Sequence, residues 1–135
     1  MSESTPEADV RPNRLLIVDD ALIMRRRIAA IAEAAGWVIA GEAKDGIQAV
    51  ELYQQLRPNL VTLDIVMPRL DGVSALKRIR ELDPDARIVM VSAVNQKSKL
   101  TECVQAGVSD FIVKPFSSSI LQQFFEKSLN AKPGG

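Results

Sequence analysis

The sequence predicts an α/β domain built on a parallel β-sheet with helices on both faces. Five short apolar segments alternate with five amphipathic segments along the chain. The apolar segments show no apolar–polar alternation, which is typical of strands buried on both faces. The length of 135 residues fits a single domain. Short connections and right-handed crossovers turn such an alternation into a parallel sheet, although the pattern alone leaves the strand order open.

Each element is justified by its local pattern. Strands are expected at residues 15–18, 37–43, 60–64, 88–91 and 110–113, which are rich in β-branched and large apolar residues. Helices are expected at residues 24–35, 45–56, 71–82, 97–106 and 117–129, where apolar residues recur at helical spacing. In the third helix, Leu82 is predicted to face inwards with the other apolar residues, and Val104 is counted in the apolar face of the fourth. Residues 1–13 and 131–135 have no apolar period and are predicted to be disordered tails, which leaves residues 14–130 as the domain.

Composition excludes several classes of function. Seventeen basic residues balance seventeen acidic ones, so no overall field favours nucleic acid or an anionic membrane. No apolar run reaches the length of a membrane span or a signal core, and a cytoplasmic location is expected by elimination. The chain has no histidine, which excludes Ser-His and Cys-His nucleophiles and histidine-containing metal sites. Cys103 is the single cysteine and is predicted to be a small packing residue.

Polar side chains stand at the ends of four of the five predicted strands. Asp19 and Asp20 follow the first strand, Asp64 ends the third, Ser92 closes the fourth and Lys114 follows the fifth. The carboxyl ends of parallel strands share one edge, and neighbouring strands are about 4.8 Å apart. Ligands bind at this edge in open α/β sheets. We therefore expect these residues to form one cluster, although a lone Asp64 or one acid of the pair could simply cap a loop or helix.

The charges of the cluster predict a bound cation. Two like charges about 4 Å apart repel by about 4 kcal/mol at an effective dielectric constant of 20. Lys114 offsets only part of the excess from three carboxylates, and Mg²⁺ with one or two carboxylates and water is the cation that fits best. A carboxylate beside Mg²⁺, a lysine and a hydroxyl is a good phosphoryl acceptor. The chemistry therefore predicts an acyl phosphate at Asp64.

These motifs resemble the receiver domain of two-component response regulators. The matching segments are LLIVDDALIM, TLDIVMPRLDG, MVSAV and DFIVKPF. They occur in the same order as in the family and at the ends of the predicted strands. The resemblance covers about residues 14–130 and is greatest to single-domain chemotaxis regulators of the CheY type. It implies a flavodoxin-like doubly wound sheet with strand order 2-1-3-4-5.

The resemblance also implies a role for each residue of the cluster. Asp64 would be the phosphorylated residue, and Lys114 would contact the phosphoryl group. Asp20 would ligate Mg²⁺ directly, Asp19 largely through water, and the backbone carbonyl of Val66 would be a third protein ligand.

The resemblance further implies a conformational switch. Ser92 would donate its hydroxyl to a phosphoryl oxygen, and Phe111 would turn inwards when Ser92 moves. Phe111 could also be an ordinary core residue of the fifth strand. The peptide bond between Lys114 and Pro115 would be cis.

The chain departs from the family pattern at two positions. Val66 and Val94 stand where CheY-type proteins often carry polar side chains, on the path of the hydrolytic water. An apolar pair cannot hydrogen-bond that water, so a long-lived phosphoryl group is predicted. Phe111 also lacks the hydroxyl of the usual tyrosine.

The predicted function is that of a phosphoacceptor signalling protein rather than an enzyme acting on a separate substrate. The resemblance implies a histidine kinase or a histidine phosphotransfer protein as phosphoryl donor. It also implies an output surface around the fourth helix, the fifth strand and the fifth helix, including Lys114, with a flagellar motor switch protein or the next carrier of a phosphorelay as partner. The arginines at residues 25–27 could dock the donor, although a solvated helix face is favoured.

Three competing interpretations remain. An aspartyl-phosphate hydrolase needs a second acidic residue two positions after its nucleophile, and this chain has Val66 at that position. A flavodoxin needs a phosphate loop rich in hydroxyls and glycine, where the acidic pair would repel phosphate. A receiver-shaped module that is never phosphorylated is disfavoured because every acceptor-site residue is present.

Overall fold

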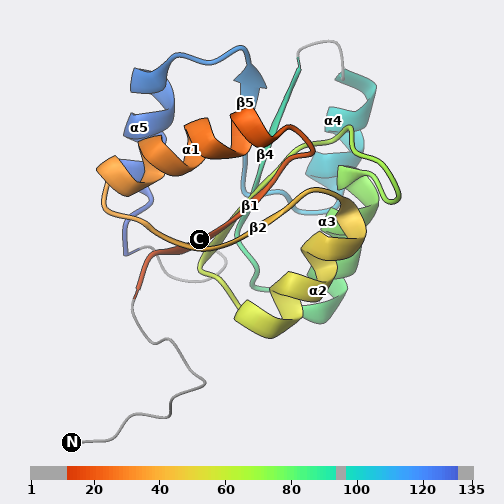
Figure 1. Cartoon of the computed structure of the whole chain (residues 1–135). Coiled ribbons are helices and arrows are strands. Elements are labelled where there is room, and N and C mark those ends of the chain that lie inside the picture. Colours follow the sequence, from red (N-terminus) through yellow and green to blue (C-terminus); the bar gives the residue numbers. More distant parts are fainter. Residues whose placement is uncertain (1–11, 94–96, 131–135) are drawn as a thin grey trace, which may run out of the picture.

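The computed structural model describes residues 12–93 and 97–130, which form one α/β domain (Figure 1). Its parallel strands are β1 (Arg14–Val18), β2 (Val38–Ala43), β3 (Leu60–Leu63), β4 (Ile88–Ala93) and β5 (Asp110–Lys114). They form one sheet in the order β2-β1-β3-β4-β5, which confirms the predicted fold and strand order. The register pairs Val18 with Leu63 and Ser92 with Val113, so the strands end close to one edge.

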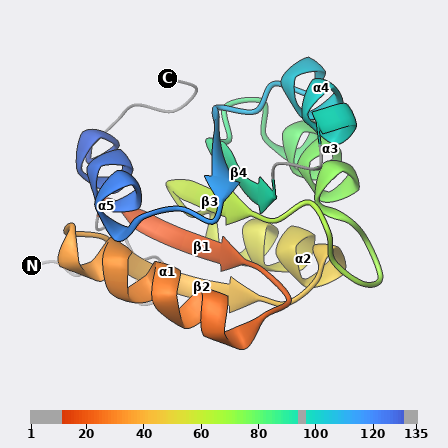
Figure 2. The same cartoon turned by 90° about the horizontal axis from the view of Figure 1, so that it is seen from above.

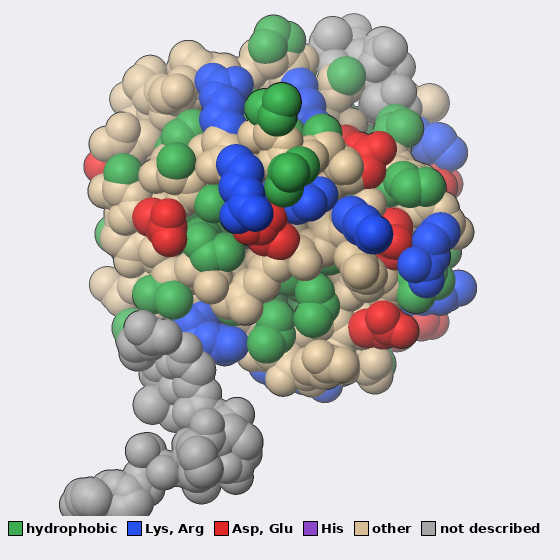
Figure 3. Space-filling model, viewed as in Figure 1, with side chains coloured by type: hydrophobic (Ala, Val, Ile, Leu, Met, Phe, Trp, Pro, Cys, Tyr) green, Lys and Arg blue, Asp and Glu red, His purple; other side chains and the backbone are tan. Residues whose placement is uncertain are grey.

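Five helices cover the two faces of the sheet. They are α1 (Leu22–Ala34), α2 (Gly46–Leu56), α3 (Gly72–Leu82), α4 (Lys97–Gln105) and α5 (Ser118–Lys127). Figure 2 shows α1 and α5 on one face and α2, α3 and α4 on the other. None of the helices in the described ranges has the length and hydropathy of a membrane span. On the face shown in Figure 3, acidic and basic side chains are interspersed, in keeping with the balanced charge.

Each face of the sheet has its own apolar core. One core joins the sheet to α2 and α3 and includes Leu63, Leu76 and Cys103, all fully buried. The other joins it to α1 and α5 and includes Trp37, whose Nε1 donates a hydrogen bond of 2.9 Å to the Phe125 carbonyl. The alternation of strand side chains explains the division, because successive residues of a buried strand face opposite cores.

The structure corrects two details of the predicted pattern. Leu82 was predicted to face inwards but is 37% exposed at the end of α3, and Val104, an apolar residue of the fourth helix, is 63% exposed. The predicted N-terminal tail included Asn13, yet its carbonyl accepts a hydrogen bond of 2.9 Å from the Val38 N–H. Residues 1–11 and 131–135, the remainder of the predicted tails apart from Pro12, lie outside the described residues.

Three helices begin at side-chain caps. Asp45 accepts from the Gln48 N–H at the start of α2, and Asp71 accepts from the Ser74 N–H at the start of α3. Ser117 accepts from the Ile120 N–H at the start of α5. These bonds satisfy N–H groups that have no partner inside the helix. At the start of α1 the N-cap residue is Ala21, which makes no side-chain cap, so neither acid of the pair is the N-cap of this helix, and Asp19 accepts instead from the Ala21 N–H at 2.9 Å.

Candidate functional site

Two neighbouring inner strands, β1 and β3, place two acidic residues side by side. Asp19 follows β1 and Asp64 follows β3, and these strands are neighbours in the sheet. The Asp64 N–H donates to the Val18 carbonyl at 3.0 Å, and the Asp19 N–H donates to the Ala43 carbonyl at 3.0 Å. The backbone of both acids is therefore anchored by the sheet itself, which fixes where their side chains start.

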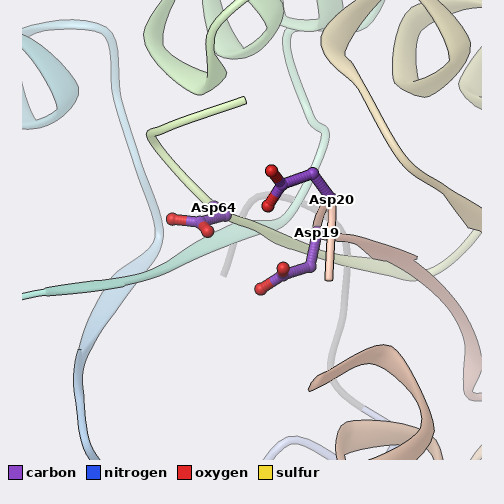
Figure 4. Close-up of side chains that lie close together, drawn as sticks. All are labelled: Asp19, Asp20 and Asp64. Carbon is purple, nitrogen blue, oxygen red and sulfur yellow. The ribbon is translucent and has the colours of Figure 1, made fainter. Parts of the chain in front are cut away.

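Asp19, Asp20 and Asp64 form an acidic cluster. Each offers a carboxylate oxygen, and these three oxygens lie within 4.8 Å of one another. Figure 4 shows the three side chains from the ends of β1 and β3 converging on one region. Asp19 and Asp64 are 1% and 8% exposed, whereas Asp20 is exposed. The predicted convergence of the acids is thus present in the structure.

Lys114 links the two buried acids. Its Nζ lies 2.7 Å from Asp19 Oδ2 and 3.0 Å from Asp64 Oδ2. Burial alone would lower the pKa of this ammonium, but the hydrogen bonds and charges of Asp19 and Asp64 outweigh burial and raise the pKa of Lys114. Lys114 therefore stays protonated and positively charged near neutral pH. Its ammonium group points into the acidic cluster, whereas the resemblance had also placed Lys114 on the output surface. The Lys114–Pro115 peptide bond is cis, as the resemblance implied.

Ser92 completes the shell around Asp64. The residue is 1% exposed, and its Oγ donates to Asp64 Oδ1 at 3.1 Å. Asp64 consequently has one donor on each oxygen, Ser92 on Oδ1 and Lys114 on Oδ2. Two donors from different strands hold this carboxylate in one orientation, which is what a nucleophile needs for in-line attack.

The donor set fits a hard divalent cation. Carboxylate and carbonyl oxygens are the ligands that Mg²⁺ prefers. Asp19 already accepts from the Ala21 N–H at 2.9 Å and from Lys114, whereas Asp20 makes no hydrogen bond or ion pair to the described residues. Val66 is 57% exposed as a residue, and its carbonyl likewise accepts no hydrogen bond from the described residues. Asp20 and the Val66 carbonyl therefore have free ligand atoms, and Asp19 has fewer.

A glycine missed by the sequence reasoning supports the loop after Asp64. The Gly72 N–H donates to the Ile65 carbonyl at 2.7 Å, and a Cβ on Gly72 would collide with the Asp64 carbonyl oxygen. No side chain fits there without moving the backbone of Asp64. The Asp71-Gly72 pair indicated only the start of a helix, because a contact between segments leaves no trace in a local pattern.

The arginines of α1 also have roles that sequence reasoning missed. Arg25 donates from Nη1 to the Asp19 carbonyl at 2.6 Å and from Nε to Glu42 at 3.0 Å, so it ties the site loop to β2. Arg27 donates to the Phe116 carbonyl at 3.0 Å and lies 4.6 Å from the centre of its ring. Arg26 and Arg27 are both exposed, as the favoured solvated face requires, and Arg26 also lies 3.3 Å from Glu42.

Phe111 and Ser92 lie on the same face of the sheet. Phe111 pairs with Met90, and Met90 and Ser92 are two residues apart on β4. Phe111 is partly buried and packs against the core that contains Met90. Both the switch and the core interpretations of Phe111 are compatible with this position. Val94 lies outside the described residues.

Comparison with known proteins agrees with this fold and site. The model of the response regulator receiver domain matches residues 15–126. The chain therefore belongs to the response regulator receiver domain family.

Its relatives include chemotaxis proteins. The chain is 48% identical to the chemotaxis protein CheY of Bacillus subtilis over 118 residues, which are 87% of this chain and 98% of that protein. The response regulator domain of Thermotoga maritima CheB has a TM-score of 0.79 and 34% identity, covering 91% of this chain and all of that one. CheY in the CheX–CheY–BeF3–Mg²⁺ complex of Borrelia burgdorferi has a TM-score of 0.76 and 35% identity, covering 83% and 85%.

Proposed function

We propose that Asp64 of this receiver domain accepts a phosphoryl group and that the phosphorylated protein signals by binding a partner. The observation that carries this proposal is the set of contacts at Asp64: Lys114 on one oxygen, Ser92 on the other, and the carboxylates of Asp19 and Asp20 alongside. The phosphoryl donor would be a histidine kinase or a histidine phosphotransfer protein, since the chain has no histidine of its own.

The transfer is an in-line displacement at phosphorus. A carboxylate oxygen of Asp64 forms the new bond to phosphorus while the bond to the donor breaks, and the electron pair of that bond leaves with the donor group. The Lys114 ammonium, charged in the neutral range, balances charge on the transferring oxygens. Ser92 is placed to donate its hydroxyl to a phosphoryl oxygen once the transfer has occurred.

The acidic cluster is the proposed Mg²⁺ site. Asp20, the Val66 carbonyl and Asp64 would hold the ion, with Asp19 contributing through water. A bound Mg²⁺ supplies charge neutralisation to the phosphoryl oxygens. This assignment explains why three carboxylates share one site with a single lysine, which leaves an excess of two negative charges.

The output surface is proposed at α4, β5 and α5. Val113 and Ile120 are 43% and 56% exposed there, and a cavity of about 290 Å³ lies between β5 and α5, lined by Phe111 and Phe124 among others. Movement of Ser92 towards the phosphoryl group would open space on the face it shares with Phe111. Because of the CheY relatives, we favour chemotaxis and a flagellar motor switch protein as partner, with another phosphorelay or a phosphate sink as the alternative.

Phosphorylation is tested by mass spectrometry of the intact protein. The protein is incubated with acetyl phosphate and Mg²⁺, and one added phosphoryl group is expected. The adduct should be absent in Asp64→Asn and without Mg²⁺, and retained in Asp85→Asn, which removes an exposed carboxylate at the opposite edge of the sheet. Turnover of acetyl phosphate without a retained adduct would point to a hydrolase and contradict the proposal.

Signalling is tested by binding. A purified motor switch protein should bind the phosphorylated chain more tightly than the unphosphorylated one, and the difference should vanish in Asp64→Asn. Ile120→Ser should weaken binding while leaving the mass adduct intact. An affinity that does not depend on phosphorylation would refute the proposed mode of signalling.

A further inference from the structure

Arg87 is a buried arginine at the edge of the sheet opposite the acidic cluster, and its side chain has no partner among the described residues. It precedes β4, its carbonyl accepts from the Val61 N–H at 3.0 Å, and the residue is 8% exposed. Its Nε and Nη1 atoms are buried and donate no hydrogen bond, and no ion pair joins the side chain to the described residues. Burial lowers the pKa of this guanidinium.

The neighbouring Arg80 shows how the terminal nitrogens of a guanidinium are bonded at this edge, while its Nε, like that of Arg87, is buried without a partner among the described residues. Its Nη1 donates to the Pro84 carbonyl at 2.8 Å and to the Ala86 carbonyl at 2.7 Å, and its Nη2 donates to the Gly107 carbonyl at 2.6 Å. A buried charge without such partners is strongly unfavourable. The described part of the chain therefore provides no partner for the buried guanidinium of Arg87.

Arg87 lines a cavity of about 200 Å³ between the loops that precede β3 and β4. Arg57, Tyr53 and Asn59 also line it. A water occupies roughly 30 Å³ in the liquid and pockets for drug-sized ligands start at about 300 Å³, so the cavity suits a small hydrated ion.

The two acids of the cavity do not bond to the side chain of Arg87. Asp83 accepts from the Tyr53 hydroxyl at 2.7 Å on one oxygen and from the Asp85 N–H at 3.0 Å on the other. Its charge is also shared with Arg57, 3.8 Å away. Asp85 is exposed to solvent. Neither acid therefore makes a hydrogen bond or ion pair to the side chain of Arg87.

We propose that this cavity binds a small oxyanion, a carboxylate or a phosphate, through the guanidinium of Arg87. The guanidinium offers several N–H donors in a rigid plane that matches such groups, and charge-assisted hydrogen bonds are about twice as strong as neutral ones. Water could accept some of these bonds but would leave the buried charge unbalanced. The site lies across the sheet from Asp64 and does not depend on the proposed phosphorylation.

The test is an NMR titration of the ¹⁵N-labelled full chain without Mg²⁺. Inorganic phosphate and acetate are added separately at constant ionic strength, which distinguishes the two sources of the oxyanion. Saturable shifts are expected for the amides of Asn59, Ala86 and Arg87 with at least one of them. Arg87→Met should abolish these shifts, because Met fills the buried site without a charge. Arg78→Met removes an exposed charge from α3 and should leave them unchanged.

Thermal unfolding gives an independent measure. At ten times its dissociation constant, the anion should lower the unfolding equilibrium constant about elevenfold in the wild type and in Arg78→Met, but not in Arg87→Met. Arg87→Lys keeps the charge without the planar fork, and its binding should be weakened rather than abolished. Absence of saturable shifts with both anions, or equal shifts in Arg87→Met, would overturn the proposal and leave Arg87 to water.

Discussion

Removing the charge of Asp20 should stabilise the protein when no Mg²⁺ is present. Asp20 shares a 4.8 Å cluster with the carboxylates of Asp19 and Asp64, and Lys114 bonds to those two acids. Asp20 itself has no hydrogen-bond or ion-pair partner in the described ranges. In Asp20→Asn the repulsion from two neighbouring carboxylates disappears, while no contact with the described part of the folded chain is lost.

The magnitude follows from the geometry. Two unit charges at that separation repel by about 3 kcal/mol at an effective dielectric constant of 20. The nearby lysine cancels part of this repulsion, and solvent screens the rest because Asp20 is exposed. We therefore expect Asp20→Asn to raise the free energy of unfolding by about 1 kcal/mol without Mg²⁺.

The assay is urea unfolding with EDTA and again with excess Mg²⁺. At a hundred times its dissociation constant, Mg²⁺ should stabilise the wild type by about 2.7 kcal/mol. In EDTA, Asp20→Asn should have a higher free energy of unfolding than the wild type, and Mg²⁺ should raise that free energy much less. The control Glu51→Gln removes an exposed carboxylate of α2 and should respond to Mg²⁺ as the wild type does.

Two results would refute this reasoning. One is an Asp20→Asn protein that is less stable than the wild type in EDTA, which would mean that the carboxylate makes a favourable contact. The other is an unchanged response to Mg²⁺, which would mean that the ion does not bind at the cluster.

Three further predictions test other parts of the structure. Tyr53→Phe should cost about 1–2 kcal/mol of unfolding free energy, because it removes the 2.7 Å bond to ionised Asp83. That bond lowers the pKa of Asp83 below its ordinary 3.8, so it stabilises the fold above pH 3.8 and is lost as the pH falls through the lowered value. Urea unfolding should therefore show a smaller acid loss in Tyr53→Phe than in the wild type, and equal acid losses would contradict the assignment. Gly72→Ala should lower the free energy of unfolding by about 1–3 kcal/mol and slow phosphorylation of Asp64, because its Cβ would collide with the Asp64 carbonyl. Ser74→Ala on the same helix is its control in urea unfolding and mass spectrometry, and matching behaviour of the two variants would refute the clash. The double variant Val66→Asn with Val94→Glu should shorten the lifetime of the phosphoryl group, which is measured as the decay of the mass adduct in Mg²⁺. An unchanged lifetime would show that the apolar pair does not slow hydrolysis.

The fold was predictable because its signals are local. The apolar segment before Asp64 and the amphipathic repeat around Leu76 are set by residues close in sequence, so the alternation of strands and helices could be recognised without coordinates. Local patterns were weaker at the ends of elements. Leu82 fits the helical period, yet it lies at the end of α3 where no other layer covers it completely.

The sequence by itself determined that Asp19, Asp20, Asp64, Ser92 and Lys114 share one edge, because parallel strands bring their carboxyl ends together whatever their order. Only the tertiary structure decided which atoms meet. The bond from Lys114 to Asp19 joins residues 95 positions apart, and the Tyr53–Asp83 bond and the buried, unsatisfied donors of Arg87 depend on the packing of separate loops. Such distances are set by strand order and helix packing, and a pattern confined to neighbouring residues carries no information about them.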